Sequence, residues 1–311
     1  MTYVATLIGK PPRMVLTDPL LRRAAEILEE PRTPQWLNPG VVADIAFTPA
    51  KPLDLKAVAE RLRAALDFIP LDIVVQIAQG RRKKLLLADM DSTMIEQECL
   101  DELAAEIGEM ASIAAITERA MRGDIAFEPA LRERVARLKG IDQATIRRLV
   151  THRITLAPGG ASLVATMRTH GAHTVLVSGG FSIFTAAIAE RIGFDDYRAN
   201  ELMFDAEGRL TGKIAEPILG RAGKRWVLQH FREKFGLSVE ETLAIGDGAN
   251  DLAMLDAAGL GVAFHAKPRV ACAATARIDH GDLTALLYVQ GYRRSDFVEN
   301  FTLKTKVKVV K

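Results

Sequence analysis

The alternation of apolar and polar positions divides the chain into two differently patterned parts. Residues 1–80 contain short apolar runs that predict strands, separated by two segments in which apolar residues recur with helical spacing. The predicted strands cover residues 3–9, 41–47 and 71–77, with a short pairing segment near Trp36. The resulting order βαββαβ is typical of a small α+β domain.

Both predicted helices of this first part have recognisable patterns. Asp18 is expected to cap the first helix, with Pro19 at its first position, because the first backbone N–H groups of a helix need an acceptor and proline has no N–H. The second helix is the amphipathic run at residues 55–68. The run QGRRKK at 79–84 then predicts a solvated linker rather than a nucleic-acid contact.

Residues 81–295 alternate apolar strands with helices, which predicts a Rossmann-like α/β fold with a parallel sheet covered on both faces. Residues 98–152 contain only helical patterns, so a helical insertion of about residues 98–155 is expected over the sheet edge. The remaining expected elements are strands at 84–89, 174–178, 260–264 and 276–279, one more at the start of 241–251, a helix over 181–193 and a hairpin over 201–214.

Residues 296–311 form a C-terminal tail. Its last part, TLKTKVKVVK, alternates lysine with small apolar residues. This pattern fits either an edge strand or a mobile terminus.

Composition and charge narrow the class of protein. The chain has 311 residues, which is about two domains as a prior. With 41 Lys and Arg against 39 Asp and Glu, the net charge of +2 argues against nucleic-acid binding. The two cysteines form no disulfide framework, and neither a signal peptide nor an apolar run long enough for a membrane span is recognisable. We therefore expect a cytoplasmic protein that binds neither nucleic acid nor membrane.

Three of the predicted strands end in polar clusters that contain glycine or small residues: DMDST at 89–93, SGG at 178–180 and GDGAND at 246–251. The carboxyl ends of parallel strands meet at one edge of a sheet, so these clusters should share one crevice. They would bring together the carboxylates of Asp89, Asp91, Asp247 and Asp251. Crowded carboxylates repel one another, and a divalent cation offsets that repulsion, with oxygen ligands favouring Mg²⁺.

The motifs DMDST, VSGGF, Lys224 and GDGAND, in that order, resemble the four motifs of the haloacid dehalogenase superfamily of phosphotransferases. The resemblance covers residues from about 82 to 290, and the placement of Glu98 and Arg134 narrows it to the phosphoserine phosphatase family. Residues 1–80 resemble the ACT-like domain that precedes the catalytic domain in many such enzymes, which implies a regulatory or dimerisation domain.

This resemblance implies roles for the four carboxylates. Asp89 would be the nucleophile that forms an aspartyl-phosphate, and Asp91 would be the general acid and then the general base. Asp89, Asp247 and the backbone carbonyl of Asp91 would hold Mg²⁺. Asp251 would orient these groups without touching the metal.

The resemblance also implies the substrate contacts. Ser178, the Gly179 N–H, Lys224 and Asn250 would hold the phosphoryl group or its ordered water. Glu98 and Arg134 match the residues that bind substrate, and we assign them to its ammonium and carboxylate respectively, because arginine offers a planar pair of donors. Met121 and Phe127 match apolar positions that would exclude water. Arg132 and Arg137 are expected to face the solvent.

The expected function is Mg²⁺-dependent hydrolysis of O-phospho-L-serine to L-serine and phosphate, the final step of serine biosynthesis. One alternative is a phosphatase or phosphotransferase for another small phosphomonoester. Another is a regulatory amino-acid-binding or dimerising protein, in which residues 1–80 carry the function. A homodimer through these residues is the expected assembly.

Overall fold

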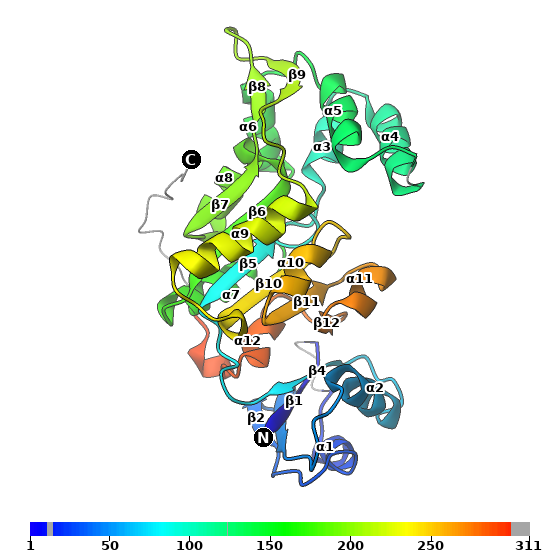
Figure 1. Cartoon of the computed structure of the whole chain (residues 1–311), viewed down its shortest axis with the longest axis vertical. Helices are drawn as coiled ribbons and strands as arrows, with labels where there is room; N and C mark the ends of the chain where they lie inside the picture. Colours follow the sequence, from blue (N-terminus) through cyan, green and yellow to red (C-terminus); the bar gives the residue numbers. More distant parts are fainter. Residues whose placement is uncertain (11–14, 123, 300–311) are drawn as a thin grey trace.

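Two large sheets organise the computed structural model, which describes residues 1–10, 15–122 and 124–299, without the side chains of 121 and 122. A four-stranded sheet belongs to the N-terminal part at the bottom of Figure 1, and a six-stranded sheet fills the centre. A group of helices and a small hairpin lie at the top. The sequence 302–311 and its predicted alternatives lie outside the described residues.

The N-terminal part has the predicted order βαββαβ. Its sheet is antiparallel, with strand order β2-β3-β1-β4, and two helices cover one face. The elements are β1 (Tyr3–Ile8), α1 (Asp18–Ala25), β2 (Gln35–Asn38), β3 (Val42–Phe47), α2 (Leu55–Ala65) and β4 (Asp72–Ile77).

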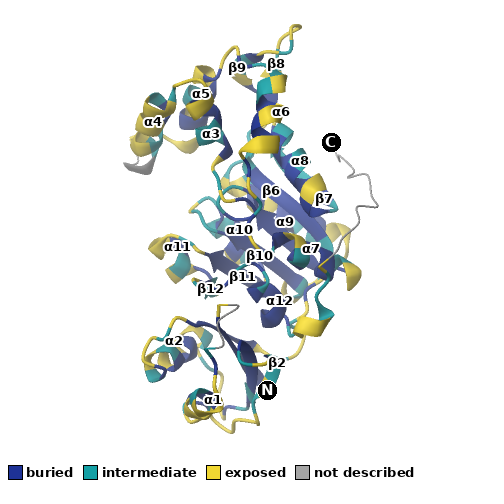
Figure 2. Cartoon of the chain, turned by 180° about the vertical axis from the view of Figure 1, so that it is seen from behind, coloured by how far each residue is buried: buried dark blue, intermediate teal, exposed yellow. Residues whose placement is uncertain are grey.

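Both faces of this sheet are buried, because it lies between its own helices and the central domain (Figure 2). Tyr3, Ala5 and Leu7 of β1 share an apolar cluster with α1 and α2. Side chains of alternating residues leave a strand on opposite faces, so Ile8 points the other way, into the core that also contains Tyr288 of the central domain. This double burial explains why residues 3–9 are nearly continuous in apolar character.

The central sheet is parallel throughout, in the order β12-β11-β10-β5-β6-β7, which confirms the predicted α/β class. Leu86 and Ala88 of β5 face one apolar cluster, with α7, α8 and α12, while Leu85 and Leu87 face another, with α9, α10 and α11. The elements are β5 (Leu85–Asp89), α7 (Gly160–Thr169), β6 (His173–Phe181), α8 (Ser182–Ile192), β7 (Asp196–Asn200), α9 (Arg221–Lys234), β10 (Thr242–Gly246), α10 (Leu252–Ala257), β11 (Leu260–Phe264), α11 (Pro268–Ala273), β12 (Ala276–Ile278) and α12 (Ala285–Val289).

Four helices stand between β5 and the α7–β6 unit and form the helical insertion: α3 (Cys99–Glu106), α4 (Met110–Arg122), α5 (Phe127–Arg137) and α6 (Gln143–His152). The hairpin of β8 (Leu202–Phe204) and β9 (Leu210–Ile214) packs against this insertion. A Cβ atom on Gly212 would lie 3.3 Å from the backbone of Ala136 in α5. The backbone N–H of Gly140 also donates to the carbonyl of Leu210 at 2.8 Å, so hairpin and insertion are in direct contact.

Two local expectations were wrong. The cap of α1 is Thr17, whose hydroxyl oxygen accepts the Leu20 N–H at 3.5 Å, and Asp18 is the first helical residue. The linker QGRRKK is not simply solvated. Lys83 is only 8% exposed and donates to the carbonyl of Glu240 at 2.7 Å, while Arg81 pairs with Asp44 at 2.5 Å. These contacts fix the connection between the two parts.

Within the described ranges, no helix combines the length and the apolar character needed to cross a membrane.

Candidate active site

A buried triad of charges lies at the carboxyl end of β5. Asp89 is the last residue of the strand and is 4% exposed. The Lys224 ammonium, in the first turn of α9, donates to Asp89 Oδ1 at 2.5 Å and to Asp251 Oδ1 at 2.6 Å. Burial alone would lower the pKa of Lys224, but these two carboxylates raise it overall. Lys224 is therefore a permanent cation beside the expected nucleophile.

Gly246 and Gly248 of GDGAND leave room for neighbouring side chains that a Cβ atom would displace. Asp251 packs its carboxyl group against the backbone of Gly246, where an added Cβ would lie 2.4 Å from Oδ2. The other oxygen of the Asp251 carboxylate is held by Lys224, and Oδ2 accepts the N–H of Gly248 at 3.0 Å. Asn250 lies across Gly248, with Oδ1 2.2 Å from the position of a Cβ there. Both glycines let polar side chains approach the turn closely.

Asp89, Asp247 and Asp251 each offer a carboxylate oxygen, and these atoms lie within 4.8 Å of one another. Burial, and then the charge of Asp251, raise the pKa of both Asp89 and Asp247. Thr93 donates from its hydroxyl to Asp247 Oδ1 at 3.1 Å, so the first and third motifs are joined directly. The three carboxylates are therefore close enough to share a cation, although Asp251 is already engaged by Lys224.

The second motif meets Asp91. Ser178, completely buried near the end of β6, donates to Asp91 Oδ2 at 3.0 Å and accepts the N–H of Gly180 at 2.8 Å. Asp91 Oδ1 accepts the N–H of Cys99 at 2.9 Å, at the start of α3. Asp91 is therefore held between the sheet and the first helix of the insertion.

The expected substrate-binding residues are Glu98, which directly precedes α3, and Arg134 of α5. The Glu98 carboxyl group accepts the Ser92 hydroxyl at 2.7 Å. Although Glu98 is exposed as a residue, desolvation of its carboxyl group, followed by the charge of Asp91, raises its pKa to about 7. Burial lowers the pKa of Arg134, and the charges of Asp101 and Glu98 oppose this shift. Glu98 is thus within electrostatic reach of Asp91 and Asp247, and Arg134 within reach of Glu98.

Phe127 is the first residue of α5, and its ring lies over the second motif. A Cβ on Gly179 would be 3.8 Å from Phe127 Cζ, an ordinary contact distance. Phe127 is 40% exposed, so its side chain also meets the solvent. Met121 belongs to α4, but its side chain lies outside the described part of the chain.

Arg132 and Arg137 are both exposed, as expected. The Arg132 guanidinium in addition pairs with Glu216, in the segment between β9 and α9, a partner that the sequence did not indicate.

Asn200 is a site residue that the sequence analysis missed. It ends β7, is 3% exposed, and donates to the carbonyl of Gly179 at 2.8 Å. Its Oδ1 accepts the N–H of Leu219 at 2.6 Å. A polar residue at a fourth strand end was the available signal, but its sequence YRAN contains no glycine turn.

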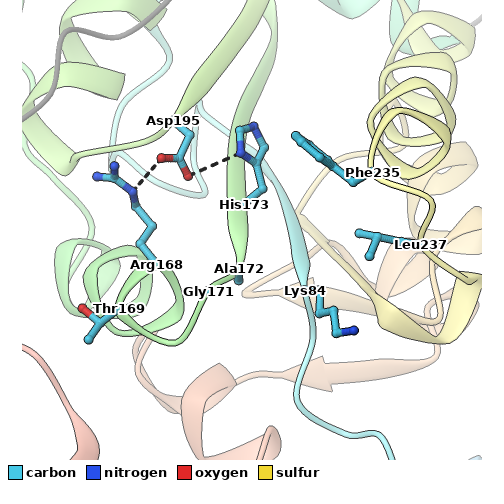
Figure 3. Close-up of a pocket in the computed structure, with 9 residues that line it drawn as sticks. All are labelled: Lys84, Arg168, Thr169, Gly171, Ala172, His173, Asp195, Phe235 and Leu237. Carbon is cyan, nitrogen blue, oxygen red and sulfur yellow. Dashed lines mark ion pairs between the residues drawn. The ribbon is translucent and has the colours of Figure 1, made fainter.

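A cavity of about 490 Å³ lies elsewhere, at the amino ends of β5 and β6 (Figure 3). Three of its polar side chains face one another: Arg168 Nε lies 2.8 Å and His173 Nδ1 3.8 Å from the carboxylate oxygens of Asp195. This is the edge of the sheet opposite Asp89. The cavity is therefore separate from the strand-end motifs.

Comparisons with known proteins agree with this geometry. A family model described as haloacid dehalogenase-like hydrolase matches residues 86–256. The chain is 41% identical over 238 residues to a phosphoserine phosphatase of Archaeoglobus fulgidus, covering 76% of this chain and 69% of that protein. It is 44% identical over 224 residues to one of Polaromonas sp., covering 69% and 94%.

The fold comparison extends over the N-terminal part. A crystal structure of a probable phosphoserine phosphatase from Vibrio cholerae, in unliganded form, has a TM-score of 0.73 at 28% identity, covering 95% of this chain and 88% of that one. The family model, the two relatives and the four sequence motifs show that the chain belongs to the haloacid dehalogenase-like hydrolases, and within them to the phosphoserine phosphatase family.

Proposed function

We propose that this protein is a Mg²⁺-dependent phosphatase that hydrolyses O-phospho-L-serine to L-serine and phosphate. The observation that carries the proposal is the contact of Lys224 with Asp89 and of Ser178 with Asp91, together with the charge interaction between Glu98 and Arg134. Lys224 and Ser178 suit a phosphoryl group, and Glu98 and Arg134 suit the two charged groups of an amino acid. The named relatives support the same reaction.

Asp89 is the proposed nucleophile. Among the described residues, its hydrogen bonds from Met90 N–H and Lys224 both reach Oδ1. We assign Oδ2 to the attack on phosphorus, which forms an oxygen–phosphorus bond as the bond from phosphorus to the seryl oxygen breaks. Protonated Asp91 gives its proton to that oxygen, and then takes a proton from the water that hydrolyses the aspartyl-phosphate. Serine and phosphate leave, and both aspartates return to their first state.

The donor set fits Mg²⁺. Asp89, Asp247 and Asp251 bring carboxylate oxygens within 4.8 Å of one another, and burial, followed by the charge of Asp251, raises the pKa of Asp89 and Asp247. Asp89, Asp247 and the Asp91 carbonyl would hold the ion, since oxygen ligands of this kind suit Mg²⁺. Bound Mg²⁺ would neutralise charge on the phosphoryl oxygens. Both oxygens of Asp251 are already bonded, so it would orient Lys224 instead.

The helices α3–α6 would act as a cap that selects the substrate. Glu98 would accept the ammonium of phosphoserine and Arg134 would bind its carboxylate through two parallel donors. Ser178, the Gly179 N–H and Asn250 would hold the phosphoryl group with Lys224. Phe127 would exclude water from the closed site.

A steady-state substrate panel tests this function. Phosphoserine, phosphohomoserine, phosphothreonine and an aryl phosphate are compared with Mg²⁺, with Ca²⁺ and with a chelator. We expect phosphoserine to have the highest kcat/KM, and chelation to abolish turnover. Ca²⁺ should inhibit, because its looser coordination can engage both oxygens of Asp89. Preference for another phosphomonoester would overturn the substrate, and full activity with chelator or Ca²⁺ would overturn the metal site.

Residues 1–80 are proposed to be an ACT-like domain, in keeping with their βαββαβ order. The proposed reaction would be the final step of serine biosynthesis, in the cytoplasm. The homodimer through this domain stays a prediction. One face of its sheet lies against the central domain, so a dimer would use the helices or the β2 edge, and light scattering of the full chain measures it.

A further inference from the structure

The aromatic ring at the start of α5 rests on a glycine outside the family motifs. Gly220 precedes α9, and a Cβ there would lie 3.2 and 3.3 Å from Cε1 and Cδ1 of Phe127. Apart from Gly220 itself and its two chain neighbours, no other heavy atom of the described residues lies within 4 Å of that Cβ position. The backbone of Gly220, at φ −110° and ψ −156°, does not itself demand glycine. The missing side chain therefore makes room for the Phe127 ring.

The surface beneath this ring is held in place by Asn200. Its amide donates to the carbonyls of Gly179, at 2.8 Å, and Leu219, at 3.2 Å. Its oxygen accepts the N–H of Leu219, the residue before Gly220. Because this buried side chain bonds both segments, it fixes the spacing between the two glycines that contact Phe127.

A second contact joins the same helix to the same segment of the core. Arg132 of α5 pairs with Glu216, with exposed side-chain fractions of 47% and 59%. Arg132 lies between Phe127 and Arg134 on this helix of 11 residues. Two contacts along one helix restrain both its position and its rotation about its own axis.

We propose that Gly220 is the seat on which the cap closes, and that the Arg132–Glu216 pair sets the rotation of α5. Gly220, Arg132 and Glu216 are then positioning residues, which bring Phe127 and Arg134 over the phosphate site. Their effect on phosphoserine rests on the proposed function, whereas the docking of α5 rests on the contacts alone. Docking is therefore also measured without substrate.

The first experiment is a double-mutant cycle at the seat. Gly220→Ala places a methyl group against the ring and should lower kcat/KM for phosphoserine about tenfold, with an unchanged Tm. In a Phe127→Ala background the same change should cost less than about twofold, since the methyl group then has no ring to displace. Equal losses in both backgrounds, or no loss in either, would overturn the seat.

The second experiment exchanges the charges of the pair. Arg132→Glu and Glu216→Arg should each lower kcat/KM for phosphoserine about two- to fivefold, because exposed ion pairs contribute modestly and salt screens them. The double variant should recover to within about twofold of the parent. Arg137→Glu, on the same helix but exposed, is the matched control and should change little. Losses that add in the double variant would contradict the pair's role.

Hydrogen exchange of the substrate-free full chain separates the two proposals. In Gly220→Ala and Arg132→Glu, the amides of 127–137 should exchange faster than in the parent, while those of α7 should not change. Unchanged exchange in α5 would overturn the docking, whatever the substrate. Faster exchange in an enzyme that does not hydrolyse phosphoserine would support the docking and reject the function.

Discussion

The carboxylate of Asp72 accepts the backbone N–H of Gly281 at 2.7 Å, across 209 positions of the chain. The same side chain, 1% exposed in β4, also accepts the N–H groups of Asp279 at 2.7 Å and His280 at 3.1 Å. One buried side chain of the N-terminal part thus satisfies three consecutive N–H groups of the central domain. The two parts are joined by specific contacts as well as by the linker.

Replacing Asp72 should destabilise the whole chain. Asp72→Ala leaves these N–H groups without their acceptor, and we expect the free energy of unfolding to fall by about 2–3 kcal/mol. Asp72→Asn keeps one acceptor oxygen and should cost less. The measurement is chemical denaturation of the full chain. Glu26→Ala, at an exposed position, is the control and should change stability by less than about 0.5 kcal/mol. If both alanine variants lost a similar free energy of unfolding, Asp72 would not stabilise the contact between the two parts.

A chain that begins at Arg81 should be less stable than the full chain. The truncation removes Gln76, which donates to the carbonyl of Val289 at 2.6 Å, and Asn38, which donates to the Tyr288 hydroxyl at 3.0 Å. It also uncovers Tyr288, which is 2% exposed in the complete structure. We expect a lower Tm and aggregation on heating, followed by calorimetry and light scattering. An unchanged Tm would show that the central domain folds without this support.

Asp89→Asn should reduce turnover of phosphoserine to background, because the substitution removes the attacking charge but nearly keeps the size. Asp91→Asn should slow turnover about 10²- to 10⁴-fold through lost proton transfer. Both variants should still bind phosphoserine, measured by calorimetry. Asp256→Asn, exposed on α10, is the matched control. Wild-type turnover by the Asp89 variant would rule it out as the nucleophile.

Glu98 should make substrate capture depend on pH near neutrality. Its raised pKa of about 7 means that the carboxylate form grows as pH rises, from about one tenth at pH 6 to about nine tenths at pH 8. Because the ammonium of phosphoserine needs that negative charge, kcat/KM should rise over this range. Glu98→Gln should remove this rise. An aryl phosphate has no ammonium, so the pH dependence of its kcat/KM reports the ionisation of the phosphate group itself. If its kcat/KM rose equally between pH 6 and pH 8, Glu98 would not be the cause of the rise.

Arg134→Ala should lower kcat/KM for phosphoserine about 10- to 100-fold, from the loss of about 1.5–3 kcal/mol in charge-assisted hydrogen bonds. An aryl phosphate without a carboxylate should be hydrolysed almost as before. The control is Arg137→Ala, because Arg132 is engaged by Glu216. Equal losses on both substrates would mean that Arg134 holds the phosphate or the cap.

Features encoded by neighbouring residues were predictable from the sequence. The apolar run of β5 followed by Asp89 reveals a strand and its polar end within a few residues, and GDGAND reveals its turn in the same way. Parallel topology then brings these ends together without further information. The α/β fold class and the meeting of the aspartates at one edge of the sheet could therefore be predicted from the sequence.

Contacts between distant segments were not predictable in this way. Lys83 can be buried because the carbonyl of Glu240, 157 positions away, accepts a hydrogen bond from its ammonium group. Asn200 donates to the carbonyl of Gly179, and Glu216 pairs with Arg132 of α5. Both contacts arise only because the fold brings distant segments together. A lysine in a basic run, or a glutamate before a proline, carries no local sign of such partners.

The close fit between Gly212 and Ala136 defines the structural unit that a transplant of the proposed substrate selectivity would have to include. A chimera that exchanges only residues 98–155 sets a foreign helix against a hairpin shaped for α5, where even a methyl group on Gly212 would meet the Ala136 backbone at 3.3 Å. Carrying residues 202–214 with the helices preserves this fit and the bond from Gly140 to Leu210. The part of the fold proposed to select the substrate is therefore split between two stretches of sequence, which recombination has to move together.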